Sequence, residues 1–129
     1  RLNFKLNQLH YLVIKMNNSD TPFGLNESQL YDLIQHDGNL VICDLRKKED
    51  FAKGHIKKSI LVQYNEENLL DIPKLSKIVL ISKDEEQSKK MSITLRAHNI
   101  DAYYLIGGIK NWSKGLYYTN ISYVGTGYL

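Results

Sequence analysis

The sequence is poor in cysteine and in proline, with one cysteine, Cys43, and two prolines among 129 residues. A single thiol excludes a disulfide within the chain and any zinc site built from several thiolates. This cysteine usage is typical of a reducing compartment, so we expect a cytoplasmic protein. The four histidines show no metal-ligand spacing, and we expect neither a metal nor another cofactor.

Long apolar runs and an excess of one charge are also lacking. No stretch approaches the roughly 18 apolar residues of a membrane-spanning helix. The net charge is only +3, and lysines are interleaved with acidic residues, as in Lys83-Asp84-Glu85-Glu86. Without a basic stripe, nucleic-acid binding is disfavoured. With 43% apolar and 24% charged residues, the composition predicts one globular domain.

Short apolar segments alternate with helical patterns along the chain. Continuous apolar runs at 40–43 and 78–81 are typical of parallel strands that are buried on both faces. Further strands are expected at 59–62 and 102–106. Four helices are expected: one that starts at a capping box at 26–29, one over 48–52, one that follows 82–87, and one over 109–114. This alternation predicts an α/β fold, a single domain whose mainly parallel central sheet has helices on both faces.

The two ends of the chain follow this pattern less well. Residues 1–24 are expected to form an N-terminal extension, in which the apolar run at 11–14 could add an edge strand. Within the domain, residues 65–70 could form a helical turn. Residues 25–116 would form the domain, and 117–129 a tyrosine-rich arm. Because the first residue is Arg1, we expect a module of a larger protein.

Three segments, in this order, carry a family resemblance. The first is Val41-Ile42-Cys43-Asp44-Leu45-Arg46, followed by Glu49-Asp50-Phe51 and Gly54-His55-Ile56. The second is the run Ile78-Val79-Leu80-Ile81-Ser82, and the third is Leu105-Ile106-Gly107-Gly108 with Trp112 four residues on. Together they resemble the rhodanese family, a group of sulfurtransferases, over most of the chain.

The signature residues also have a structural interpretation. Asp44 and Arg46 follow a buried strand and are expected to hold the loops at the strand end. Gly54 is expected to end a helix with a positive φ. His55 is interpreted as a structural hydrogen-bond partner and not as a catalyst.

The closing segment is interpreted in the same way. Gly107 and Gly108 allow a tight turn from a strand into a helix. Trp112 is expected to pack in the core, with an acceptor for its indole N–H.

The second segment departs from the family pattern. In the active members that this chain resembles, the loop after this strand begins with a cysteine and ends, after four further residues, with an arginine. The corresponding six residues of this chain are Ser82-Lys83-Asp84-Glu85-Glu86-Gln87. A hydroxyl cannot carry a persulfide, and a free serine is a weak nucleophile. The position of the anion-binding arginine is occupied by Gln87. The three acids Asp84, Glu85 and Glu86 disfavour an anionic donor but suit the start of a helix.

Cys43 does not replace the missing cysteine, because it lies within an apolar strand beside Asp44, where burial and charge both raise a thiol pKa. We therefore expect a catalytically degenerate, non-catalytic module that binds a partner protein. It is similar to the regulatory modules of some ubiquitin-specific proteases and MAP-kinase phosphatases. The alternatives are a sulfurtransferase or phosphatase that works by an unusual route, and a small-ligand sensor.

Overall fold

The protein is represented by a computed structural model, which describes residues 23–62 and 76–118. Within them, five strands form one sheet in the order β1-β5-β4-β2-β3. The strands are β1 (Gly24–Leu25), β2 (Leu40–Asp44), β3 (Ser59–Leu61), β4 (Lys77–Ile81) and β5 (Ala102–Leu105). Every neighbouring pair is parallel, which confirms the predicted α/β class.

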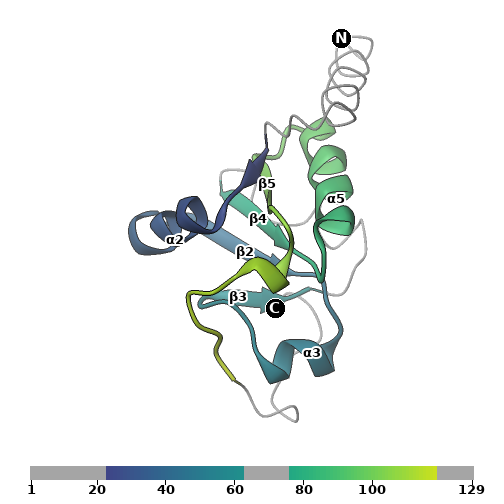
Figure 1. Cartoon of the computed structure of the whole chain (residues 1–129). Coiled ribbons are helices and arrows are strands. Elements are labelled where there is room, and N and C mark those ends of the chain that lie inside the picture. The colour runs from purple at the N-terminus through teal and green to yellow at the C-terminus, as the bar shows by residue number, and fades with distance from the viewer. Residues whose placement is uncertain (1–22, 63–75, 119–129) are drawn as a thin grey trace.

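Helices cover both faces of this sheet. They are α2 (Glu27–His36), α3 (Lys48–Lys53), α5 (Glu85–Ala97) and the 3-10 turn η1 (Ile109–Asn111). Helices α2 and α5 lie on opposite sides of the sheet, and α3 lies beyond β3 (Figure 1). The last helix is shorter than the predicted 109–114, since it ends before Trp112.

The two central strands explain the continuous apolar runs. Along β4, Ile78 and Leu80 pack with Met91 and Leu95 of α5. The alternate residues, Val79 and Ile81, pack on the other face in a cluster with α2. Because successive side chains of a strand point to opposite faces, a strand between two helical layers needs an apolar residue at every position.

The helix ends show where local prediction succeeds and fails. The capping box is confirmed, because Asn26 Oδ1 accepts from the N–H of Gln29 and Gln29 Oε1 accepts from the N–H of Asn26, both at 2.8 Å. The spacing of Met91, Leu95 and His98 in the sequence predicts that His98 shares the apolar face of the long helix, and this expectation is wrong. His98 is exposed, because α5 ends at Ala97 and His98 is its C-cap residue.

Several expectations concern residues outside the described ranges. These are the edge strand at 11–14, the helical turn at 65–70 and all of the tyrosine-rich arm after Tyr118. One edge of the described sheet is β1, which pairs with β5, and the other edge is β3. In the described ranges, no helix is long and apolar enough to cross a membrane.

Candidate functional site: the loop after β4

The loop after β4 begins with Ser82, whose side chain points into the protein. Ser82 is only 1% exposed. Its Oγ donates to the carbonyl oxygen of Asp84 and lies 2.8 Å from the Oγ of Ser88. It also accepts from the backbone N–H of Ser88 at 3.2 Å. The hydroxyl is thereby bonded to both the loop and the first turns of α5.

The loop itself is short, because α5 already begins at Glu85. Three of the six residues that the family resemblance places in the loop, Glu85, Glu86 and Gln87, are therefore helical. Asp84 is the N-cap residue, and its Oδ1 accepts from the N–H of Glu86 at 3.2 Å. The expected role of the acids at a helix start is confirmed, and it agrees with the preference of helix N-termini for negative charge.

A second segment, the turn between β5 and η1, closes over this loop. The backbone N–H of Gly107 donates to Glu85 Oε1 at 2.8 Å, and that of Ile109 donates to the Ser82 carbonyl at 2.9 Å. A Cβ on Gly108 would lie 2.5 Å from the carbonyl oxygen of Lys83. The turn therefore requires glycine for close approach as well as for its positive φ of 75°.

These contacts determine what the loop can do chemically. An anion-binding loop presents free backbone N–H groups at a helix N-terminus. Here the N–H groups of Glu86 and Ser88 already donate to side chains of the chain itself. The loop is thus arranged to stabilise the start of α5.

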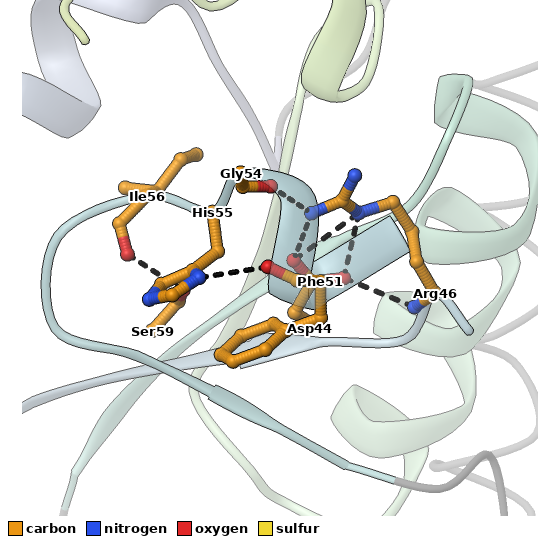
Figure 2. A network of polar contacts seen from close by, with 7 residues as sticks. All are labelled: Asp44, Arg46, Phe51, Gly54, His55, Ile56 and Ser59. Atoms are coloured by element: carbon orange, nitrogen blue, oxygen red, sulfur yellow. Dashed lines mark hydrogen bonds and ion pairs between the residues drawn. The ribbon is translucent and has the colours of Figure 1, made fainter. Parts of the chain in front are cut away.

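Asp44 and Arg46 form a buried ion pair at the carboxyl end of β2 (Figure 2). Arg46 Nη2 lies 2.9 Å from Asp44 Oδ2, and Nε lies 3.0 Å from Oδ1. The same Nη2 donates to the carbonyl oxygen of Gly54 at 2.7 Å. Since the Asp44 side chain is fully buried, this bidentate pair fixes the loop after β2 against the end of α3.

His55 lies beside this pair, and its described contacts are with the backbone and with the ring of Phe51. Its Nδ1 donates to the Phe51 carbonyl at 2.8 Å, since a carbonyl oxygen can only accept. The rings of Phe51 and His55 stack with centroids 3.9 Å apart (Figure 2). The backbones of His55 and Tyr117 form an antiparallel bridge, which ties the segment after η1 to the end of α3.

The expectation of a positive φ at Gly54 is wrong. Its φ is 172°, which is extended backbone that any residue adopts. The glycine instead leaves room for Leu116, because a Cβ at this position would lie 3.0 Å from Leu116 Cδ1 and that side chain would have to shift. Trp112 packs in the core between α2 and the sheet, and its Nε1 donates to the Gly115 carbonyl at 2.8 Å.

Cys43 lies inside β2 and is fully buried. The pKa of its thiol is raised to about 12, chiefly by burial and to a smaller extent by the charge of Asp44. Both the burial and the raised pKa disfavour the thiolate, which is the nucleophilic form of cysteine.

Sequence reasoning did not single out Ser88, which completes the Ser82 network. A signal was present, because Ser88, Met91, Ser92 and Leu95 have the i, i+3, i+4, i+7 spacing of one helix face, and all four are buried. No group of acidic, histidine or cysteine side chains that could hold a metal ion occurs in the ranges that the structure describes.

Comparisons with known proteins agree with the fold. The family profile described as "Rhodanese-like domain" matches residues 26–115. A rhodanese-like domain protein from Staphylococcus aureus has 22% identity and a TM-score of 0.63, with 75% of this chain and 98% of that one covered. The rhodanese-like domain of an Anabaena protein has 16% identity and a TM-score of 0.65, covering 80% and 83%.

A thiosulfate sulfurtransferase from Pseudomonas aeruginosa is also similar in structure. It has 14% identity and a TM-score of 0.64, and the match covers 92% of this chain and 23% of that one. At these identities the likeness shows the fold alone. No curated protein sequence matches the chain.

Proposed function

Because this chain belongs to the rhodanese-like domain family, we propose that it is a non-catalytic member, which binds a partner protein in place of transferring sulfur. The observation that carries the proposal is the environment of Ser82. This residue directly follows β4, the strand that leads into the family's active loop, and its hydroxyl is buried and bonded to Asp84 and Ser88.

The chemistry of sulfur transfer supports the proposal. The reaction needs a sulfur atom that can take up and release a second sulfur, and a thiolate does this where a hydroxyl does not. The one thiol of the chain, Cys43, has a pKa of about 12 and is buried in β2. Neither Ser82 nor Cys43 offers an accessible thiolate to a donor.

The negative charge around the loop also supports the loss of sulfur transfer. Asp84 and Glu86 are exposed at the start of α5, and Gln87 stands in the helix at the position of the family's arginine. Thiosulfate is an anion, and like charges at the entrance of a site disfavour its binding. An exposed acidic helix start is compatible with a protein-binding surface.

In this proposal the module resembles the regulatory modules of some ubiquitin-specific proteases and MAP-kinase phosphatases, in which the fold presents a surface to a partner. It would work in the cytoplasm, where a free buried thiol stays reduced.

A sulfur-transfer assay tests the loss of catalysis. Purified protein is incubated with thiosulfate and cyanide, and thiocyanate is measured against a boiled control. We expect no thiocyanate above that control. Turnover that disappears in Ser82→Ala or in Cys43→Ala would overturn the proposal.

A further inference from the structure

A small groove lies between α2 and the segment after η1, away from the Ser82 loop. Its volume is about 120 Å³. Tyr31 and Ile34 contribute from α2, Lys57 comes from the loop before β3, and Trp112, Lys114 and Tyr117 come from the C-terminal side. That last segment is held in place by the backbone bridge between Tyr117 and His55.

The size of the groove limits what can occupy it. Pockets for metabolites and drug-sized ligands measure about 300–1,000 Å³. A dry cavity of about 150 Å³ is enough for one benzene ring. A volume of about 120 Å³ is smaller than both, so this open groove has room for at most one aromatic side chain of a peptide, part of which would stay outside, and it argues against a small-ligand sensor at this groove.

The charge of the groove selects the kind of peptide. Two lysines, Lys57 and Lys114, line it, and none of the described residues that line it is acidic. The ammonium group of Lys114 lies 5.4 Å from the centroid of the Tyr31 ring. The carboxylate of nearby Glu27 accepts from both the N–H and the hydroxyl of Ser113, and its charge offsets part of the charge of Lys114, so that Lys57 is the lysine of the groove without a described acidic partner. An acidic ligand would complement this surface.

Exposed aromatic side chains surround the same groove. Tyr31 is 40% and Tyr117 is 51% exposed, and the adjacent Leu116 and Tyr118 are 51% and 77% exposed. The described part of the chain has one other exposed large apolar side chain, Ile106. Tyrosine and tryptophan are enriched at the centres of protein interfaces, and clustered exposed apolar side chains mark interaction sites.

We propose that this groove, between α2 and the segment 112–117, binds an acidic peptide of a partner protein, with one aromatic side chain of the peptide against Trp112. The proposal deepens the protein-binding function and rests on it. Carboxylates that flank the aromatic residue would face Lys57 and Lys114.

The sole tryptophan of the chain makes the test direct, because Trp112 lines the groove. The whole chain is titrated with a short capped peptide of glutamates around one phenylalanine, and the Trp112 emission is recorded. We expect a saturable change that weakens as salt is added. We expect Lys57→Glu and Lys114→Glu each to weaken binding roughly three- to tenfold. Lys110→Glu, an exposed lysine of η1 that does not line the groove, should leave it unchanged.

Three results would overturn the groove assignment. They are no change in emission, an equal response to a peptide with lysine in place of glutamate, and unaltered binding by both groove variants. Competition by inorganic phosphate alone, at equal ionic strength, would also overturn it, because the groove would then bind small anions. The thiocyanate assay separates the two proposals. If the protein shows no turnover and the peptide does not bind, only the groove assignment is wrong. If the protein shows turnover, the non-catalytic function is wrong.

Discussion

The hydroxyl oxygens of Ser82 and Ser88 lie 2.8 Å apart, between the end of β4 and the second turn of α5. Ser88 Oγ also donates to the carbonyl of Glu85 at 3.1 Å, and its N–H donates to Ser82. Both side chains are buried. The hydroxyl of Ser82 thus has a structural partner on the helix, which a reacting group at the same position would have to give up.

Loss of this contact should lower stability. Ser88→Ala removes one partner of the buried Ser82 hydroxyl, which keeps the Asp84 carbonyl and the backbone N–H at position 88, so we expect the free energy of unfolding to fall by about 0.5–1.5 kcal/mol. Urea denaturation measures the change. In a double-mutant cycle with Ser82→Ala, the two losses should not add, because the residues share one network. Additive losses would contradict the network. Ser28→Ala, at an exposed position of α2, is the matched control with little expected change.

The buried pair of Asp44 and Arg46 predicts a larger effect. Arg46→Met leaves the buried carboxylate of Asp44 without its partner, which typically costs about 3–5 kcal/mol. The control is Lys90→Met, which breaks an exposed pair with Glu86 and should cost at most about 0.5 kcal/mol. Thermal unfolding of both variants checks this. Equal losses in the two would show that Arg46 does not stabilise the loop after β2.

Two glycines predict opposite outcomes for the same substitution. Gly108→Ala should lose about 1–3 kcal/mol from the backbone alone, because a φ of 75° with a ψ of −169° is reached almost only by glycine. Its new Cβ would also collide with Lys83 and Asp84. Gly38→Ala meets no atom within 4 Å and should be neutral or slightly stabilising. Chemical denaturation compares them, and a tolerated Gly108→Ala would refute the close packing of this turn.

The thiol of Cys43 predicts a pH dependence. Its pKa is raised to about 12 in the folded protein from an ordinary value of 9.0, chiefly by burial. Between these values the unfolded chain has lost the proton and the folded chain keeps it. This contribution to stability is therefore fully present below pH 9 and is lost as the pH rises towards 12.

The measurement is unfolding by urea across that range, for the wild type and for Cys43→Ala. Other groups titrate in both proteins, so the difference between the two curves isolates Cys43. We expect the wild type to lose stability more steeply with pH. Parallel curves would mean that the thiol is accessible to solvent. Alkylation by iodoacetamide at neutral pH should proceed only on unfolding.

The sequence predicts the layers of this fold well, and for a physical reason. The runs 40–43 and 78–81 are apolar at every position, which only a strand between two helical layers requires. Local signals such as the capping box of Asn26 and Gln29 also predict correctly, since the partners lie within one turn.

Contacts between distant segments could not be predicted in the same way. Gly54 looks like an ordinary helix-ending glycine, and only the approach of Leu116 reveals its role. The groove joins α2 to residues 112–117, and nothing local in either segment indicates the other. The order of the strands in the sheet likewise depends on tertiary packing.

The loss of sulfur transfer is tested most sharply by the mass of the intact protein after incubation with thiosulfate. Wild-type protein and Ser82→Cys are treated side by side and measured without reducing agent. We expect the wild type to gain no sulfur, because Ser82 cannot carry it and Cys43 is buried with a raised pKa. A wild-type mass increased by one sulfur atom, with the increment lost in Cys43→Ala, would contradict this expectation and make this chain a sulfur carrier.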